Sequence, residues 1–233
     1  MAEVVNNHRL YGDITVVKDD TSISYWIKKN MIWEENILKI LCEHLKKRPG
    51  TFIDAGAFIG PHSIGVSKII PGTKIVAFEP SKLAFSCLEE NATRCYTPNS
   101  EIYNIALGNE SGKGFMVYNG DGNPGGSGLK KEVHDNNTQM NEVNIRTLDS
   151  FNIDNVSVIK IDTEGQEDNV ILGAANTIKK YKPVLVVEIQ GGCTYSTATP
   201  EQKRAIEKTT ALIQSLGYKV ELIHAHDYLC TPL

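Results

Sequence analysis

The chain has 233 residues, with 24 basic and 28 acidic side chains and a formal net charge of −4, and this length suits one α/β domain with a sizeable core. No basic stretch is dense enough to indicate a nucleic-acid partner, and no apolar run approaches the roughly 20 residues of a membrane helix. The N-terminus lacks the basic start and apolar core of a secretory signal. We therefore expect a cytoplasmic protein whose five scattered cysteines stay reduced.

The first predicted elements are a hairpin and a helix. Residues 10–28 alternate apolar and polar side chains on either side of a central acidic pair, which predicts a β-hairpin. An amphipathic helix is predicted over residues 32–47, and a Pro-Gly pair ends it. We accordingly expect residues 1–30 to form an N-terminal hairpin extension and residues 31–233 to form the main domain.

From residue 51 onward, predicted strands alternate with predicted helices. The expected core strands are 51–54, 74–78, 101–106, 156–161 and 184–189, with short strands at 115–118 and 142–147 and closing strands at 218–223 and 228–233. A helix is expected after the glycine turn at residues 56–60, running through Ile64 to about residue 70. Further helices are expected over 83–94, 167–180 and 200–216. This order predicts a parallel, doubly wound sheet with helices on both faces, which binds ligands at the carboxyl ends of its strands.

One long connection interrupts this order. Residues 119–141 are rich in glycine, asparagine and charge, and connections of this length in a compact domain are commonly lids, binding loops or disordered segments. We expect a lid or acceptor-binding role, with Ser127 as the loop residue nearest a bound cofactor.

The segment TFIDAGAFIG, residues 51–60, is typical of a strand, a glycine turn and a helix start. Gly56 and Gly60 let the backbone approach a ligand closely, and the helix start offers free N–H groups. Glu79 ends the next predicted strand, where a carboxylate can accept both hydroxyls of a ribose. Because G-x-G-x-x-G is absent and Phe58 suits an uncharged ligand segment, a nucleoside such as S-adenosylmethionine fits better than a dinucleotide.

Four ordered blocks carry a family resemblance: FIDAGAFIG, VAFEPS, NIALGN and IKIDTEGQEDNVILGA, followed by KPVLVVEIQG. They cover about residues 50–192 and resemble the FkbM-type methyltransferases. The resemblance implies a Rossmann-like class I methyltransferase fold, with a mostly parallel seven-stranded sheet whose last strand is antiparallel. It also implies methyl transfer from S-adenosylmethionine, mostly to a hydroxyl oxygen and often on a sugar or a polyketide.

The resemblance further implies how the cofactor is held. The glycine turn would line its methionine and ribose side, Glu79 would hold the ribose diol, and Asn104 and Ala106 would lie beside the adenine. Phe58 stands where the family more usually has asparagine. The full set that we predict to bind the cofactor is Asp54, Gly56, Phe58, Gly60, Glu79, Pro80, Ser81, Asn104, Ala106 and Ser127.

Methyl transfer requires a positioned acceptor and a group that takes its proton. Lys160 and Asp162 share one face of a predicted strand, with Asp162 at the carboxyl end of that strand. Glu164 follows in the turn, and Glu188 ends the next strand. These four are the predicted catalytic residues. One carboxylate could be the base, or Asp162 and Glu188 could bind Mg²⁺ or Mn²⁺; alternatively, Lys160 and Asp162 form an ion pair that braces the strand.

The histidines give weaker signals. His62 follows the glycine turn, where a packed side chain is more common than a catalytic one. His224 and His226 have no evident third partner for a metal site.

The function that we predict is an S-adenosylmethionine-dependent O-methyltransferase acting on a small molecule or glycan, with no nucleic-acid or membrane partner and an oligomeric state left open. The alternatives are a nucleoside- or cofactor-binding module without transfer activity and an NAD-dependent oxidoreductase.

Overall fold

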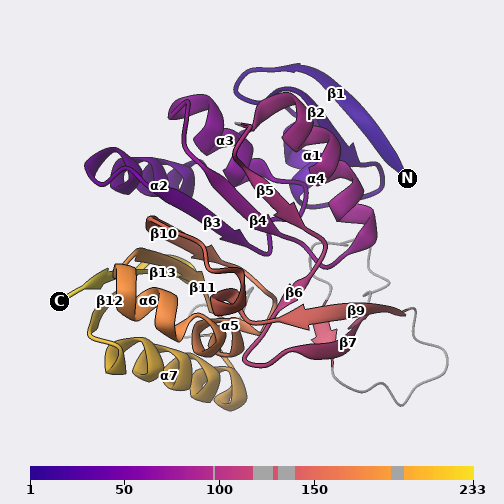
Figure 1. The fold of residues 1–233 in the computed structure, drawn as a ribbon. Coiled ribbons are helices and arrows are strands. Elements are labelled where there is room, and N and C mark those ends of the chain that lie inside the picture. Colours follow the sequence, from indigo (N-terminus) through magenta and orange to yellow (C-terminus); the bar gives the residue numbers. More distant parts are fainter. Residues whose placement is uncertain (97, 118–127, 131–139, 190–196) are drawn as a thin grey trace.

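The computed structural model describes residues 1–96, 98–117, 128–130, 140–189 and 197–233. Its centre is a seven-stranded sheet in the order β12-β13-β11-β10-β3-β4-β5 (Figure 1). The strands are β3 (Thr51–Ala55), β4 (Ile75–Phe78), β5 (Glu101–Tyr103), β10 (Val156–Ile161), β11 (Val184–Glu188), β12 (Tyr218–His224) and β13 (Asp227–Pro232). Only β13 runs antiparallel to its neighbours within this sheet. The predicted mostly parallel sheet with an antiparallel last strand is confirmed.

Helices cover both faces of this sheet (Figure 1). One face carries α2 (Glu35–Lys47), α3 (Pro61–Ile69) and α4 (Lys82–Cys95), and the other carries α5 (Glu167–Gly173), α6 (Ala175–Tyr181), α7 (Pro200–Ser215) and the short 3-10 helix η2 (Leu148–Phe151). Successive strand residues point to opposite faces, so Phe52 packs with α2 while Ile53 packs with α5 and α6. The core strands are therefore apolar on both faces, as in other parallel sheets.

One predicted helix is two helices in the structure. We expected a continuous helix over residues 167–180, but the backbone leaves helical geometry at Ala174, which has φ −108° and ψ 5°. The Ala174 side chain is fully buried among residues of both short helices and the sheet. The break thus lies at a residue packed against both helices and the sheet.

The predicted N-terminal hairpin exists but lies earlier in the chain than expected. Its strands are β1 (Ala2–His8) and β2 (Gly12–Val17), and residues 23–28 form the helix α1 (Ile23–Lys28). Asp20 explains the difference, because its carboxylate accepts hydrogen bonds from the backbone N–H groups of Ser22 (3.0 Å) and Ser24 (2.6 Å). These bonds satisfy free donors at a helix start, which the alternating pattern concealed.

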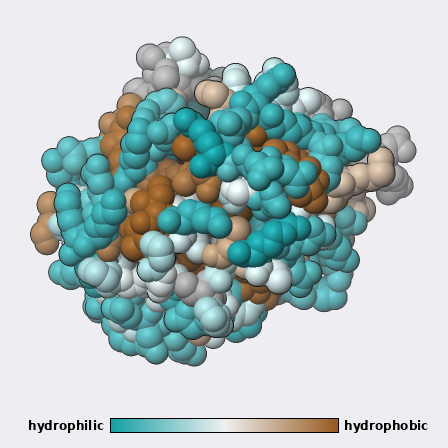
Figure 2. All heavy atoms as spheres, turned by 90° about the horizontal axis from the view of Figure 1, so that it is seen from above, coloured by the Kyte–Doolittle hydropathy of each residue, from teal (hydrophilic) through white to brown (hydrophobic). Residues whose placement is uncertain are grey.

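The hairpin packs on the outer side of α4 and on the glycine turn. Tyr11, Ile14 and Ile27 share an apolar cluster with Phe58 and Ile64. Figure 2 looks onto this end of the molecule and shows hydrophobic side chains gathered among hydrophilic ones. The division into residues 1–30 and 31–233 stays a prediction, but the two parts share this cluster.

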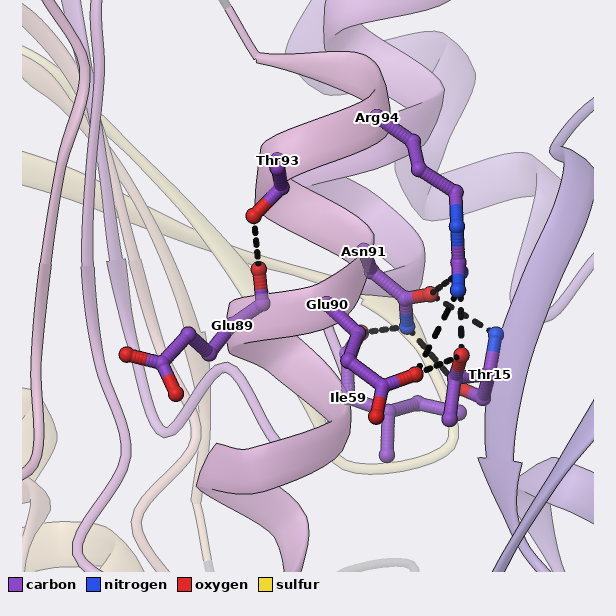
Figure 3. A network of polar contacts seen from close by, with 7 residues as sticks. All are labelled: Thr15, Ile59, Glu89, Glu90, Asn91, Thr93 and Arg94. Carbon is purple, nitrogen blue, oxygen red and sulfur yellow. Dashed lines mark hydrogen bonds and ion pairs between the residues drawn. The ribbon is translucent and has the colours of Figure 1, made fainter.

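A polar network adds to that contact. Asn91 of α4 donates to the carbonyl oxygens of Thr15 and Ile59, both at 2.9 Å, and accepts from the backbone N–H of Thr15 at 2.7 Å (Figure 3). Its side chain is fully buried. Asn91 therefore connects the hairpin directly to the loop that contains the glycine turn.

A second, four-stranded sheet follows β5, in the order β6-β9-β7-β8. Its strands are β6 (Ala106–Leu107), β7 (Gly112–Val117), β8 (Gly128–Lys130) and β9 (Met140–Arg146). The short strands predicted near residues 115 and 142 are found in β7 and β9, but the strand predicted over 101–106 is divided between the two sheets. The chain leaves the large sheet at Asn104, whose amide donates to the backbone carbonyls of Glu79 (2.8 Å) and Pro80 (3.1 Å). None of the helices in the described ranges is long and apolar enough to cross a bilayer.

Candidate functional site

Four of the predicted site residues lie at the same edge of the large sheet. Asp54 is near the end of β3, Glu79 follows β4, Asp162 follows β10 and Glu188 ends β11. The registers align these ends, since Ala55 is paired with both Ile161 and Phe78. The parallel strands therefore bring these carboxyl groups to one place, as their positions in the sequence predicted.

The glycine turn is held in left-handed backbone geometry. Gly56, Phe58 and Gly60 have φ values of 84°, 51° and 88°, which only glycine adopts without cost. Gly60 directly precedes α3, whose first residue is Pro61, a common residue at that position. A Cβ built on Gly56 would lie 1.7 Å from the backbone oxygen of Asp162. The close packing of Gly56 against the Asp162 backbone therefore requires glycine at this position, whether or not a ligand also approaches it.

Glu79 joins the turn to the next helix. Its buried carboxylate accepts hydrogen bonds from the backbone N–H groups of Phe58 (2.8 Å) and Ser81 (2.7 Å). Burial raises the pKa of Glu79 to about 7, although these two bonds act in the opposite direction. Each carboxylate oxygen retains a second lone pair, so Glu79 can still accept hydroxyl hydrogen bonds.

Of the remaining residues predicted to bind the cofactor, some lie next to Glu79 and one lies in the small sheet. Pro80 and Asn104 are joined to it by the amide contacts described above, and Ser81 caps α4 by accepting from the N–H of Ala84 (3.4 Å). Ala106, by contrast, lies in the small sheet and packs in its apolar cluster. Ser127 lies outside the described residues.

The unusual phenylalanine of the turn has a structural role. The ring of Phe58 is buried in the cluster beneath the hairpin, with 7% of the residue exposed, whereas its backbone N–H bonds to Glu79. We therefore assign the backbone of Phe58 to the site and its ring to the core.

Lys160 and Asp162 form a buried ion pair. The Lys160 ammonium lies 2.8 Å from Asp162 Oδ2, and Lys160 is only 3% exposed while the Asp162 side chain is 23% exposed. Burial disfavours the charge on Lys160, but Asp162, Asp54 and Glu34 outweigh it and raise the pKa of the lysine above its usual range. Lys160 is therefore a fixed cation that positions Asp162. The pair is compatible with both readings, a structural brace and a positioned catalytic carboxylate.

Asp54 of β3 is paired in register with Lys160 of β10 and is almost fully buried. Ser63 of α3 donates its hydroxyl to Asp54 Oδ2 at 2.5 Å. The other oxygen, Oδ1, has no hydrogen-bond partner among the described residues. Burial raises the pKa of Asp54, against the opposing effect of Lys160. A buried acceptor without a donor is a position where a ligand can supply one.

The turn after β10 is held by Glu167 rather than by Glu164. Glu167 accepts from the backbone N–H groups of Thr163 (3.1 Å) and Gly165 (2.9 Å) and from the Thr163 hydroxyl (3.1 Å). Glu164 is exposed and has φ 52°. Crowding by protein atoms and repulsion from Asp162 and Glu188 raise the pKa of Glu164 to about 8. Glu167 thus shapes this turn, while the Glu164 side chain is open to solvent.

Three residues that the sequence did not single out as site residues also reach this edge. His226 contacts Glu188 at 3.0 Å, and Asp227, the first residue of β13, is paired in register with Glu188. Glu34 precedes α2 with φ 42°, and its Oε2 lies 3.4 Å from Nε2 of His62. An acidic residue just before a helix is usually a solvated partner of the helix dipole, so no sequence signal distinguished Glu34.

His62 is packed rather than solvated. It is 4% exposed, and burial together with the Lys160 charge lowers its pKa well below 6.5. His62 is therefore a neutral neighbour of Glu34 at physiological pH.

A metal site at Asp162 and Glu188 is not supported. In the described part of the chain, no group of three His, Cys, Asp or Glu side chains is placed to hold a metal ion. Asp162 is already paired with Lys160, so the cation that we expected beside this carboxylate is the lysine.

Comparisons with known proteins agree with this geometry. The model of the methyltransferase FkbM domain family matches residues 54–220. No curated protein sequence matches the chain. Among solved structures, a methyltransferase FkbM from Methylobacillus flagellatus is 19% identical with a TM-score of 0.53; the alignment covers 78% of this chain and 43% of that one. A precorrin-6y C5,15-methyltransferase from Geobacter metallireducens is 14% identical with a TM-score of 0.52, covering 87% and 89% of the two chains. At these identities the structural likeness establishes the fold, which is Rossmann-like.

Proposed function

This chain belongs to the FkbM methyltransferase domain family, and from that premise we propose that it is an S-adenosylmethionine-dependent O-methyltransferase acting on a hydroxyl of a small acceptor, such as a sugar or glycan. The observation that carries the proposal is the meeting of Asp54, Glu79, Asp162 and Glu188, all within the matched range, at one edge of the sheet. The chain spans 43% of the length of the Methylobacillus protein.

The residues around the glycine turn fit the proposed cofactor. Glu79 retains lone pairs for a ribose diol, and Asp54 Oδ1 is a buried acceptor without a donor among the described residues. The N-terminus of α3 follows the turn directly. Asn104 fixes the backbone that follows β4 and thereby keeps Glu79 in place. These groups would hold a nucleoside with a positively charged amino-acid tail.

The proposed catalytic group is Asp162. Its partly exposed carboxylate is held by Lys160 at 2.8 Å, and a positioned carboxylate can take the proton of an acceptor hydroxyl. When bound, the cofactor supplies a methyl group on a sulfonium, which passes to the acceptor oxygen and leaves a neutral thioether. Lys160 balances the charge of Asp162 before the proton arrives. Glu164 and Glu188 surround the same space and can pass the proton on toward solvent.

Two measurements test this proposal. Calorimetric titration with S-adenosylmethionine and with NAD separates a methyltransferase from an oxidoreductase, because the proposal predicts binding of the first ligand and not of the second. A mass-spectrometric screen for the gain of one methyl group across glycans, polyketides and peptides then tests transfer. Cofactor binding with no methyl gain across the panel would favour a binding module without transfer activity.

The glycan acceptor, a cytoplasmic location and the absence of a nucleic-acid partner stay predictions from the sequence. The proposal includes no divalent ion, because Lys160 occupies the cation position beside Asp162.

A further inference from the structure

We infer that the acceptor carries a positive charge, a protonated amine close to the hydroxyl that is methylated, and that Glu34, Glu188 and Asp227 form the acidic subsite that binds this amine. The inference rests on the proposed function, since it names the substrate class of the same site.

Two of the three carboxyls, Glu188 and Asp227, lie on the opposite side of Asp162 from the glycine turn. In the strand order, β10 separates β11 and β13 from β3 and β4. Glu188 and Asp227 are Cα partners at the ends of β11 and β13, and Glu34 is close enough for both carboxyls to affect its charge. An amine held by Glu188 and Asp227 would therefore lie across the proposed base from a cofactor at the glycine turn, while Glu34 approaches the same edge from the start of α2, where it contacts His62.

The charges of the subsite do not balance. Lys160 is paired with Asp162, and the half-buried His226 contacts Glu188 at 3.0 Å. His62 faces Glu34 but its lowered pKa keeps it neutral. His224 lies 3.5 Å from Asp227, but its side chain is 61% exposed. Glu34 and Asp227 thus have no buried cation of their own among the described residues.

One oxygen of each of these two carboxyls has no hydrogen bond to the described residues, although a histidine nitrogen lies 3.4 Å from the oxygen of Glu34 and 3.5 Å from that of Asp227. Glu34 Oε2 and Asp227 Oδ2 are buried oxygen atoms without a hydrogen-bond partner in the described part of the chain, and Asp227 is 2% exposed. Buried acceptors without donors are rare in native proteins. Burial raises the pKa of Glu34 to about 8; Lys160 acts in the opposite direction, and the surrounding carboxyls add smaller contributions that raise it. A bound cation with N–H groups would supply both the positive charge and the hydrogen-bond donors that these carboxyls lack among the described residues.

The chemistry of the subsite favours an ammonium group. An ammonium offers three donors, and the three carboxyls come from three separate segments of the chain. A divalent ion needs ligands that converge at short distances, and the described residues contain no such group. Glu34 and Asp227 also lie outside the range matched by the family model. This is expected of acceptor recognition, which varies between members that share one cofactor.

A binding experiment tests the inference without requiring the natural acceptor. The chain is first saturated with S-adenosylhomocysteine, and glucosamine and N-acetylglucosamine are then titrated into it, followed by galactosamine and N-acetylgalactosamine. Each pair shares a sugar skeleton and differs in the charge of the nitrogen. We expect the amine of each pair to bind at least tenfold more tightly than its acetylated form.

Substitutions then locate the effect. Glu34→Gln and Asp227→Asn remove the charge that each carboxylate would carry beside a bound amine, at almost unchanged volume. Either should abolish the preference for the amine while leaving the affinity for S-adenosylhomocysteine within about twofold. Glu221→Gln is the matched control, because this carboxyl of β12 is exposed and pairs with Lys219. It should leave the preference intact. Thermal melting of each variant establishes that it is folded.

Several results would overturn the inference. Equal affinities within both sugar pairs, including no detectable binding by any of the four, would exclude the amine subsite. Tight binding of Mg²⁺ that Asp227→Asn abolishes would identify a metal site in its place. A chain that does not bind S-adenosylhomocysteine at all would instead contradict the proposed function, so the two failures are distinguishable.

Discussion

Gly56 lies directly against the backbone of Asp162, so that a Cβ on the glycine would stand 1.7 Å from the Asp162 carbonyl oxygen. The backbone N–H of Asp162 in turn donates to the carbonyl of Ala55 at 3.0 Å. The glycine turn and the proposed catalytic carboxylate are therefore one rigid unit. A change in the turn must move the base as well as the cofactor site.

Gly56→Ala should damage both stability and activity. The substitution places a side chain at φ 84°, which costs about 1–2 kcal/mol, and it also drives Cβ into backbone, which adds about 1–3 kcal/mol. Urea denaturation should show the summed loss. Calorimetry should show weaker binding of S-adenosylmethionine.

Gly72→Ala is the control for this experiment. Gly72 has a similar φ of 90°, but a Cβ there meets no atom within 4 Å. It should show the conformational cost alone and leave cofactor binding unchanged. Equal losses of stability in the two variants would mean that the contact with Asp162 adds nothing.

Cofactor affinity should depend on pH through Glu79. Burial raises the pKa of this group from 4.5 to about 7, so the folded chain holds the proton more tightly than the unfolded chain. The contribution of Glu79 to the free energy of unfolding thus falls as the pH rises from 4.5 to about 7. A ribose diol favours the ionised carboxylate, so affinity for S-adenosylhomocysteine should increase by about tenfold between pH 6 and 8.

Substitution of Glu79 should remove that dependence. Glu79→Gln places an N–H₂ group against one of the two backbone donors, Phe58 or Ser81, because these bond to different carboxylate oxygens. We expect a loss of about 1–3 kcal/mol in binding with a flat pH profile. Glu101→Gln serves as the control, because Glu101 lies on the neighbouring strand β5 and pairs with Lys74 on the surface. If the pH profile of Glu79→Gln matched that of the parent chain, another group would carry the titration.

Much of the fold could be predicted from the sequence, because the core strands carry continuous apolar runs and end in polar residues. The errors occurred where a side chain overrides the local pattern. Asp20 starts a helix inside an alternating segment, and Asn104 diverts a strand into a second sheet. Both effects depend on hydrogen bonds to backbone groups, which periodicity does not reveal.

The candidate site was predicted for residues that follow the strand rule and missed for residues that do not. Asp54, Glu79, Asp162 and Glu188 end parallel strands. Asp227 instead begins the antiparallel strand β13, whose start lies where parallel strands end. Glu34 lies in no strand and reaches the edge only through the packing of α2. The sequence thus predicted the site residues that end parallel strands, but not Asp227 and Glu34.

Asn91→Ala should destabilise the chain through the hairpin. The change leaves the buried N–H and C=O of Thr15 and the carbonyl of Ile59 without their side-chain partner, and each such group costs about 1–3 kcal/mol. Thr93→Ala, two residues further along α4, is the control, because the hydroxyl of Thr93 bonds to the Glu89 carbonyl of the same helix (Figure 3). Chemical denaturation should show a large loss for the first variant and almost none for the second. Similar curves would disprove a role of the network in attaching the hairpin.

Asp162→Asn should separate catalysis from structure. The variant keeps the shape and the contact with Lys160 but removes the charge, and loss of a positioned base typically costs about 10²–10⁴-fold in rate. Cofactor affinity should change far less, because Glu79 and the glycine turn provide it. Asp168→Asn is the control, since Asp168 of α5 pairs with Lys208 of α7 rather than with Lys160.

The same variant tests the two alternatives for Asp162. If the ion pair is only a brace, Asp162→Asn leaves Lys160 without its nearest partner and lowers the melting temperature, while the rate per folded molecule stays near normal. That result would remove Asp162 from the reaction. A metal role makes a different prediction, because EDTA would then abolish transfer and Mg²⁺ or Mn²⁺ would restore it. We expect EDTA to leave the rate unchanged, because the ammonium of Lys160 already balances the carboxylate at 2.8 Å.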